Sequence, residues 1–319
     1  MGVDVIVVGG GVSGLVTAVV LAERGLRVRV WTREEATETT SSVAGGLWWP
    51  YRIEPKELVG EWSTATLRVY EEFAERPGET GVRLVAGVME GSRRSGLGPW
   101  SARLDGVRDA RADELPPGHM EGVWARVPLV DMPAHLGWLR QRLEAAGGTV
   151  ELRAVASFAE AAATARTVVN CAGLAARELV PDEGLVPVRG QLVVVENPGV
   201  EEWFVSADGA SSETTYLLPQ PGRLILGGTA EEGHQRTEPD PATAAAIVAR
   251  CARIRPEVAG ARVLAHRVGL RPARPAGVRI AAEHRPDGGL LVHNYGHGGA
   301  GVTVAWGCAR AAAALVPDR

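Results

Sequence analysis

The order of apolar and polar positions divides the chain into two regions of different character. Near the N-terminus, the apolar run at residues 4–8 predicts a buried parallel strand, residues 15–24 show a helical pattern, and residues 28–32 read as a second strand. From residue 186 onward, short apolar runs separated by turn residues predict antiparallel strands instead. We therefore expect an α/β fold with one parallel and one antiparallel part.

The same criteria predict the remaining elements. Further helices are expected at residues 55–76, 131–146 (capped by Asp131, with Pro133 in its first turn), 241–254 and 302–316. Further strands are expected at residues 82–89, 123–127, 150–155, 167–170, 190–195, 215–219, 223–228, 262–270 and 290–293. The middle pair at 150–155 and 167–170 looks like a return to the first sheet, so we expect two interleaved domains.

A glycine-rich turn joins the first strand to the first helix. Gly9-Gly10-Gly11-Val12-Ser13-Gly14 is G-x-G-x-x-G in strand-to-helix context, which is typical of a dinucleotide-binding unit. Gly9 permits the tight turn, Gly11 lets the backbone approach a pyrophosphate, and Gly14 lets helix and strand pack closely. The positive end of the helix would face the phosphate charge.

The end of the second strand departs from the usual dinucleotide pattern. A carboxylate commonly stands there to bind ribose hydroxyls, but Thr32 and Arg33 come first, with Glu34 and Glu35 after them. Arg33 would suit a ribose 2′-phosphate. These residues alone therefore leave an NADP-binding site open.

Composition narrows the class of protein. The chain has 319 residues, 45% hydrophobic and 23% charged, with a net charge of -4, so neither nucleic acid nor a membrane is expected as a partner. The first strand starts at residue 4 with no basic region before it, so we expect no signal peptide. Three widely spaced cysteines fit a reducing cytoplasm and form no metal-binding motif.

Several motifs together resemble the D-amino-acid oxidase family. They run in order along nearly the whole chain: Gly46-Leu47-Trp48-Trp49-Pro50-Tyr51, Asn170-Cys171-Ala172-Gly173, Val188-Arg189-Gly190-Gln191, Gly269-Leu270-Arg271-Pro272-Ala273-Arg274-Pro275 and His293-Asn294-Tyr295-Gly296-His297-Gly298-Gly299. The last is close to that family's signature. The resemblance implies non-covalent FAD rather than NADP, since members of the family tolerate a basic residue where Arg33 stands.

The resemblance also implies a reaction and an architecture. The reaction is oxidative deamination of D-amino acids, mainly neutral and of broad range, by hydride transfer to flavin N5, giving 2-oxo acids, ammonia and, with molecular oxygen, hydrogen peroxide. The candidate protein assembly is a homodimer. The Rossmann-like FAD-binding domain would be discontinuous, with an interleaved α+β antiparallel-sheet domain for the substrate. We expect the first at residues 1–50, 138–185 and 266–319, and the second at residues 51–137 and 186–265.

The resemblance assigns roles around the substrate. Arg271 matches the arginine that holds the substrate carboxylate, for which a planar, permanently charged fork is suited. Tyr216 matches a tyrosine whose hydroxyl contacts the same carboxylate, and Gly299 a position whose carbonyl accepts from the substrate amine. We interpret His297 as a support for its loop rather than a base. The second active-site tyrosine of vertebrate members falls at Ser212 and is absent here, and the segment around it is short, so we expect no long lid.

The cofactor residues follow from the same match. Gly301, Val302 and Thr303 begin the final helix, whose positive end would face the flavin C2 carbonyl. The full predicted cofactor set comprises Gly9, Gly11, Val12, Ser13, Gly14, Thr32, Arg33, Thr39, Thr40, Ser41, Gly45, Gly46, Leu47, Val155, Arg271, Gly296, Gly298, Gly299, Gly301, Val302 and Thr303. No metal site is predicted.

Three other functions share some of these features. A D-aspartate oxidase would need a second cation for the side-chain carboxylate, for which only Arg223 or His234 are placed. A glycine or sarcosine oxidase shares the glycine-rich opening but not the Gly-Leu-Trp-Trp-Pro-Tyr segment. A flavin-binding protein without turnover is opposed by the presence of Arg271, Tyr216 and Gly299. Among wall residues, Trp49 and Met89 are the candidates for setting side-chain specificity.

Overall fold

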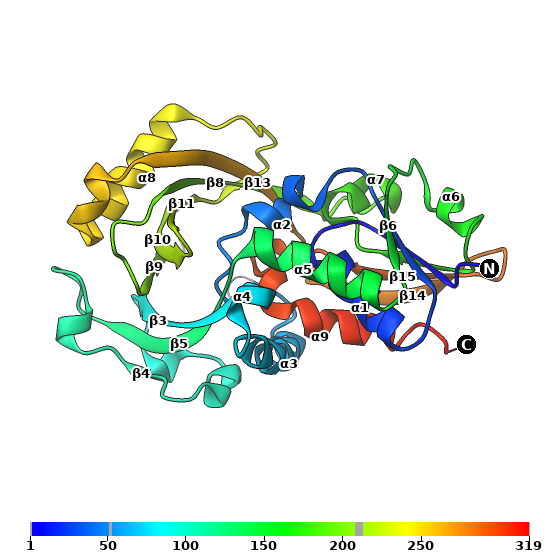
Figure 1. Cartoon of the computed structure of the whole chain (residues 1–319), viewed down its shortest axis with the longest axis horizontal. Helices are drawn as coiled ribbons and strands as arrows, with labels where there is room; N and C mark the ends of the chain where they lie inside the picture. The colour runs from blue at the N-terminus through cyan, green and yellow to red at the C-terminus, as the bar shows by residue number, and fades with distance from the viewer. Residues whose placement is uncertain (1, 51–52, 208–212, 319) are drawn as a thin grey trace.

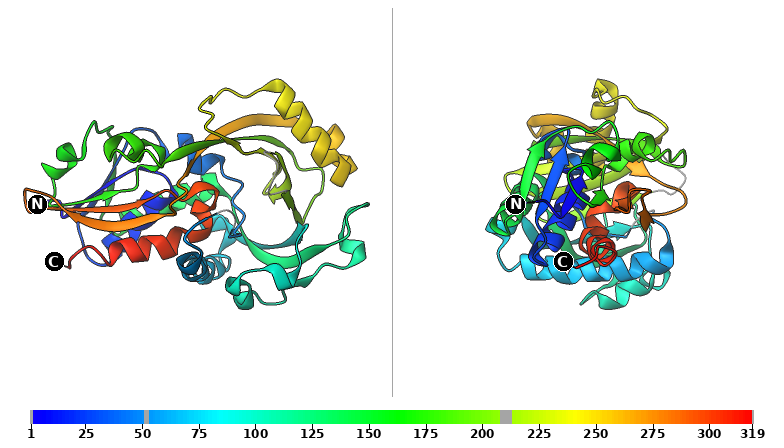
Figure 2. Two further views of the ribbon diagram at one scale, coloured as in Figure 1. Left: turned by 180° about the vertical axis from the view of Figure 1, so that it is seen from behind. Right: turned by 90° about the vertical axis from the view of Figure 1, so that its right-hand side faces the viewer.

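Two sheets built from interleaved segments make up the molecule. The computed structural model describes residues 2–50, 53–207 and 213–318. Figure 1 shows the two sheets side by side along the long axis, and Figure 2 shows from behind that both chain ends lie in the half with the smaller sheet. The predicted combination of a parallel, dinucleotide-type sheet with a largely antiparallel one is confirmed.

The smaller sheet has six strands in the order β14-β15-β7-β1-β2-β6. Its strands are β1 (Val5–Val8), β2 (Val28–Thr32), β6 (Thr149–Leu152), β7 (Thr167–Asn170), β14 (Arg279–His284) and β15 (Leu290–Tyr295). All pair in parallel except β14, which runs antiparallel to β15 at the edge. The predicted return of the middle segment to this sheet is confirmed, whereas β14 was not expected, and β6 ends before the predicted residue 155.

Helices cover both faces of this sheet. They are α1 (Val12–Glu23), α5 (Met132–Ala145), α6 (Phe158–Ala162), α7 (Ala176–Leu179) and α9 (Gly301–Ala313). Side chains alternate across β1, so Val5 and Val7 join the core with α1 and α9, while Ile6 and Val8 join the core with α6. As predicted, Asp131 caps α5, its carboxylate accepting from the Ala134 N–H at 3.5 Å.

The larger sheet has nine strands, in the order β12-β8-β11-β10-β9-β3-β5-β4, with β13 also paired to β8. Its strands are β3 (Val82–Glu90), β4 (Arg108–Asp109), β5 (Gly122–Val130), β8 (Val186–Glu196), β9 (Trp203–Ala207), β10 (Glu213–Gln220), β11 (Arg223–Thr229), β12 (Glu231–Glu232) and β13 (Val263–Ala273). The predicted hairpin is confirmed as β10 and β11. The pairing is antiparallel except between β3 and β9, which run parallel, and β9 was not expected.

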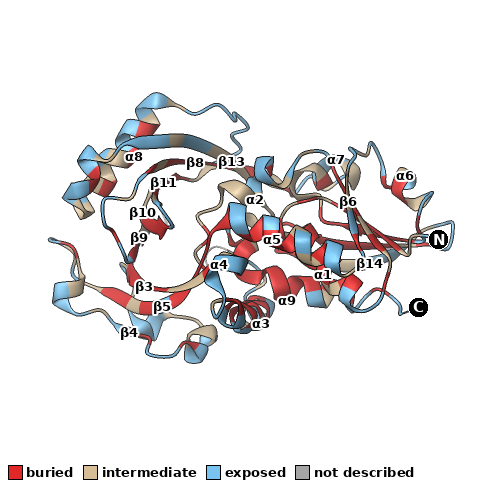
Figure 3. Ribbon diagram, in the orientation of Figure 1, coloured by how far each residue is buried: buried red, intermediate tan, exposed pale blue. Residues whose placement is uncertain are grey.

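Two longer helices contact the larger sheet. Helix α8 (Pro241–Ile254) packs Ala244, Ile247 and Cys251 against one face, and Figure 3 shows α8 exposed on its outer side. Helix α3 (Lys56–Phe73) lies against α9, and both are buried where they meet. Short helices complete the described part: α2 (Thr40–Val43), α4 (Pro77–Thr80), and single turns at Ala36–Glu38, Arg94–Gly96, Pro99–Arg103, Ala112–Glu114, Gly173–Ala175, Pro256–Gly260 and Gly298–Ala300.

None of the helices within the described ranges combines the length and apolarity needed to cross a membrane. All three cysteines are buried as free thiols. Across residues 2–50, 53–207 and 213–318, no group of three or more His, Cys, Asp or Glu side chains is arranged to hold a metal ion.

His135 on α5 gives a first testable prediction. It is fully buried among Tyr70, Phe73 and Trp138, its Nδ1–H donating to the Thr80 carbonyl at 2.8 Å, and burial lowers its pKa to about 4. Between about pH 6.5 and pH 4 the unfolded chain therefore binds a proton that the folded protein does not, so lowering the pH destabilises the fold. By pH 5 the loss at this group is about 2 kcal/mol.

Urea unfolding of wild type and His135→Gln at pH 7.5 and pH 5 measures this contribution. Glutamine does not titrate, so the stability gap between the two proteins should narrow by about 2 kcal/mol at the lower pH. A gap that stays constant would contradict a neutral His135 in the folded protein.

Candidate active site

A cavity of about 1140 Å³ runs between the two sheets. It extends from Trp31 and Arg153 at one end to Tyr216 and Arg271 at the other, and it is lined by residues from both. The predicted site residues that line it are Gly9, Gly11, Val12, Ser13, Thr32, Arg33, Thr39, Thr40, Ser41, Gly45, Gly46, Leu47, Val155, Tyr216, Arg271, Gly296, Gly298, Gly299, Gly301 and Val302. Gly14 and Thr303 do not line it. Ser212, where the missing tyrosine falls, lies outside the described residues.

The glycine-rich turn has a shape that only glycine allows. Gly9 has a φ of +118°, and a Cβ there would lie 2.2 Å from the carbonyl oxygen of Cys171. A Cβ on Gly14 would lie 1.9 Å from the carbonyl oxygen of Gly9, so Gly14 serves the packing of α1 against the turn. With Gly11 as its N-cap and no acidic side chain in its first turn, α1 directs its positive end at the cavity, as a diphosphate requires.

At the Trp31 end of the cavity, the predicted residues Thr32 and Arg33 both have partners within the protein. Thr32 is buried and its hydroxyl donates to the Glu34 carbonyl at 2.9 Å, so it has no free donor for a ribose. Arg33 is largely exposed and lies 3.6 Å from the Glu34 carboxylate. Glu34 lines the cavity and follows β2 closely, which was the available signal for it. The guanidinium of Arg153, which was not predicted, lies 3.9 Å from the centre of the Trp31 ring.

His297 is held inside the signature loop. Its Nε2 lies 3.0 Å from Asn294 Oδ1 and its Nδ1 3.4 Å from Ser13 Oγ, so both ring nitrogens have partners. Because the Asn294 oxygen can only accept, Nε2 carries the proton. Burial lowers the pKa of His297 to about 4, which keeps the ring neutral. This geometry agrees with a support for the loop between β15 and α9, which His297 ties to α1 through Ser13.

A polar cluster that the sequence did not reveal anchors the same loop. Asp182 accepts from the Tyr295 hydroxyl at 2.7 Å and from Arg274 Nε at 2.9 Å. Burial opposes ionisation of Asp182, but these hydrogen bonds outweigh it and hold its pKa below the ordinary value. Arg274 lies three positions after Arg271 on the same chain segment, so the cluster joins the signature loop to the strand that carries Arg271.

Arg271 reaches its position by crossing a neighbouring strand. It stands on β13 opposite Val188 of β8, and its guanidinium passes over Gly190, where a Cβ would lie 2.4 Å from both terminal nitrogens. Its Nη1 donates to the Thr229 carbonyl at 2.9 Å. Gly299 is close by, since a Cβ there would lie 3.5 Å from Arg271 Cδ. The structure thus brings Arg271 and Gly299 together at one end of the cavity.

Tyr216 occupies the same end. Its ring packs on Gly227, where a Cβ would lie 1.7 Å from Tyr216 Cζ, and its hydroxyl approaches Gly228. Burial raises the pKa of Tyr216, although the charge of Arg271 opposes the rise. The hydroxyl therefore keeps its proton and can donate to an anion. Arginine and tyrosine together form a pair suited to a carboxylate.

The wall beside this pair is apolar. Val205 and Met89 stand in register with Tyr216 across β10, β9 and β3, and all three line the cavity. Trp49 is fixed by edge contacts with Trp100 and by a backbone clamp, in which the Thr303 hydroxyl accepts from its N–H at 3.2 Å and donates to its carbonyl at 3.0 Å. The wall is therefore rigid and suits an uncharged side chain.

The two cations considered for a second carboxylate lie elsewhere. Arg223 donates to Asp131 at 2.6 Å and does not line the cavity. His234 is exposed and outside the lining as well. Register instead places Glu232 in the row of Arg271, with Val188 between them, and Glu232 does line the cavity.

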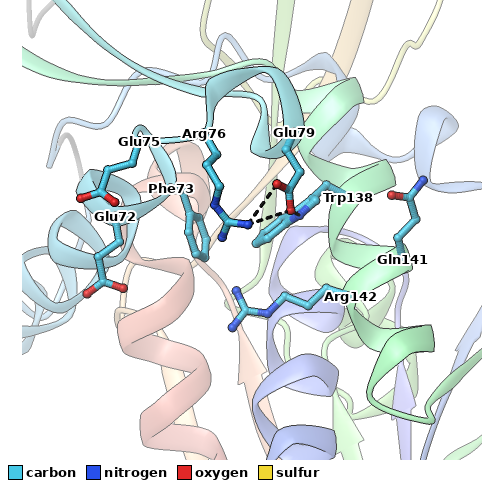
Figure 4. Close-up of a pocket in the computed structure, with 8 residues that line it drawn as sticks. All are labelled: Glu72, Phe73, Glu75, Arg76, Glu79, Trp138, Gln141 and Arg142. Atoms are coloured by element: carbon cyan, nitrogen blue, oxygen red, sulfur yellow. Dashed lines mark hydrogen bonds and ion pairs between the residues drawn. The ribbon is translucent and has the colours of Figure 1, made fainter.

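A second hollow of about 640 Å³ lies on the outer surface between α3, α4 and α5 (Figure 4). Both of its arginines form ion pairs: Arg76 with Glu79 of the same hollow at 3.0 Å, and Arg142 with Glu23 of α1 at 2.7 Å. It has no glycine-rich backbone and lies away from Arg271. The cavity between the sheets is therefore the candidate site.

Comparison with known proteins agrees with this geometry. A family model described as FAD dependent oxidoreductase matches residues 4–315. The D-amino-acid oxidase of Streptomyces coelicolor is 66% identical over 98% of this chain and 96% of its own length, and that of Rubrobacter xylanophilus is 50% identical over 97% and 94%. The D-aspartate oxidase of Homo sapiens is 34% identical over 98% and 94%.

Solved structures add the fold alone. The glycine oxidase of Bacillus cereus superposes with a TM-score of 0.79 at 19% identity, covering 98% of this chain and 94% of that one. At such low identity the likeness concerns the arrangement of the two sheets.

Proposed function

The chain belongs to the family of FAD-dependent oxidoreductases, and from this premise we propose that it oxidises D-amino acids with neutral side chains. The products would be 2-oxo acids, ammonia and, with molecular oxygen as acceptor, hydrogen peroxide. The proposal rests on the pairing of Arg271 and Tyr216 at one end of a cavity that the glycine-rich turn also lines.

The residues present fit non-covalent FAD. The cradle of Gly9, Gly11 and α1 suits the diphosphate. Gly45, Gly46 and Leu47 line the cavity where the flat ring would lie, and the start of α9 at Gly301 lies at the same cavity. FAD, when bound, supplies the acceptor for the hydride that leaves the substrate α-carbon.

The protein's own contribution is binding and orientation. Arg271 and Tyr216 hold the substrate carboxylate, the carbonyl of Gly299 accepts from the amine, and the apolar wall receives the side chain and excludes water. His297 takes no proton from the substrate, because it is buried and both of its nitrogens are engaged.

D-aspartate oxidase is the second candidate, since a relative of that name is 34% identical. Besides Arg271, the arginines that line the cavity in the described residues are Arg33 and Arg153, at the Trp31 end, and Arg274, which is bound to Asp182. Glu232 in the row of Arg271 would also repel a second carboxylate. Both points favour a neutral substrate.

Three buried free thiols support a cytoplasmic location, where thiols stay reduced.

Anaerobic bleaching of the flavin absorption band tests the proposal. D-methionine, L-methionine, D-aspartate and glycine are added separately to the purified holoenzyme, and D-methionine alone should bleach the band rapidly. Oxygen uptake with peroxide release should follow when air is admitted. Bleaching by D-aspartate or glycine alone would move the assignment to those oxidases, and a protein without a flavin band would overturn the cofactor.

A further inference from the structure

The pairing of β8 with its neighbours is interrupted beside Arg271. Strand β11 pairs with β8 as far as Gly227 opposite Leu192, and β12 resumes the pairing with Glu231 opposite Arg189. Between these two pairs, the three residues 228–230 face only the two residues 190–191. This is a β-bulge, a device that bends a strand and redirects its groups, and that is frequent next to active sites. We call residues 228–230 the Thr229 bulge.

Two hydrogen bonds hold the Thr229 bulge in place. The backbone N–H of Gln191, which has no β11 carbonyl opposite it here, donates to the Thr229 hydroxyl at 3.0 Å. Nη2 of Arg250, from α8, donates to the Gly228 carbonyl at 3.1 Å. Both Gln191 and Thr229 are buried, so water does not replace the first contact. The Thr229 hydroxyl thus replaces the backbone carbonyl that would accept from the Gln191 N–H in an unbroken β-ladder.

The backbone carbonyl of Thr229, within the bulge, accepts a hydrogen bond from Arg271. Arg271 comes from β13, crosses β8 over Gly190 and donates from Nη1 to the Thr229 carbonyl at 2.9 Å. We infer that Thr229 is a positioning residue, whose hydroxyl fixes the bulge so that its carbonyl aims the guanidinium of Arg271 at the substrate carboxylate. The inference rests on the proposed function of Arg271.

Thr229→Val and Thr229→Ser form the first test. Valine keeps the shape but leaves the Gln191 N–H without an acceptor, so the carbonyl and the guanidinium should shift. We expect the KM for D-methionine and the Kd for propanoate, a carboxylate without an amine, to rise about tenfold, with kcat changed less than about threefold. Serine keeps the hydroxyl and should restore wild-type values. Wild-type KM in Thr229→Val, or no rescue by serine, would overturn the inference.

A double-mutant cycle with Arg271→Lys separates positioning from a general structural role. If Thr229 acts through the guanidinium, Thr229→Val should change the propanoate Kd less than about twofold in the Arg271→Lys background, because the aimed group is already gone. A tenfold change that persists there would overturn the inference. An unchanged KM in Arg271→Lys itself would instead overturn the proposed carboxylate site.

The flavin absorption band reports whether each variant is folded and loaded. If Thr229→Val retains no flavin, Arg250→Gln gives the same test, since it removes the donor to the Gly228 carbonyl at the other side of the bulge. It should raise the KM while leaving kcat nearly unchanged. A wild-type KM in Arg250→Gln would then contradict the role of the bulge.

Discussion

Replacement of Arg271 by lysine is expected to raise the KM for D-methionine about 30- to 100-fold and to slow reduction of the flavin. Arginine presents a planar fork that binds a carboxylate through two parallel hydrogen bonds while another nitrogen stays on the Thr229 carbonyl. A lysine ammonium is a point charge and cannot do both in the same geometry. Steady-state kinetics and anaerobic stopped-flow reduction measure the two effects.

Arg267→Lys is the matched control for this experiment. Arg267 lies on the same strand, β13, but is exposed and does not line the cavity, so the same change of side chain should leave KM unchanged. Kinetics like those of wild type in Arg271→Lys would remove Arg271 from the substrate site.

Gly190→Ala should inactivate the enzyme while leaving it folded. The new Cβ would lie 2.4 Å from the terminal nitrogens of Arg271, so the guanidinium must move aside. The fold can absorb this, because the displaced group is the end of a flexible side chain, but the substrate loses its anchor. A misplacement of about 1 Å costs roughly 100-fold, so we expect kcat/KM to fall at least that far. The flavin band and the melting temperature should stay close to wild type.

Gly269→Ala provides the control for steric change on this sheet. Gly269 is the direct partner of Gly190 across β13 and β8, yet its added Cβ would lie 3.4 Å from Val43 Cβ, an ordinary contact. Its activity should therefore stay within a few-fold of wild type. Equal loss in both variants would mean that the crossing of Arg271 over Gly190 is not the cause.

The sequence predicted elements well where the pattern was local. The first strand, the glycine-rich turn and α1 form one contiguous unit, so their residues suffice to identify them. Strand β14 was not predicted because it is an edge strand with exposed residues toward its end, so its sequence has no clear apolar pattern. Strand β9 was also missed; it lies between β10 and β3 and pairs in parallel with β3, which comes from a distant part of the chain.

The site shows the same division. Arg271 and Tyr216 were singled out because they match positions of a family that the chain resembles. Asp182, Thr229 and Arg153 were not, because their roles depend on partners brought together only by the fold: a tyrosine hydroxyl, a backbone N–H in a broken ladder, and a tryptophan ring. The assigned roles of Arg271 and Tyr216 stay predictions until the kinetic variants are measured.

The interleaved order of the six-stranded sheet has a consequence for biosynthesis. β1 leaves the ribosome first, yet the sheet also needs β7 at Thr167–Asn170 and β15 at Leu290–Tyr295. At roughly 5–20 residues per second, β15 follows β1 by about 15–60 s. Throughout that time the nascent chain holds unpaired strand edges, and a product truncated before β15 cannot complete this half of the molecule.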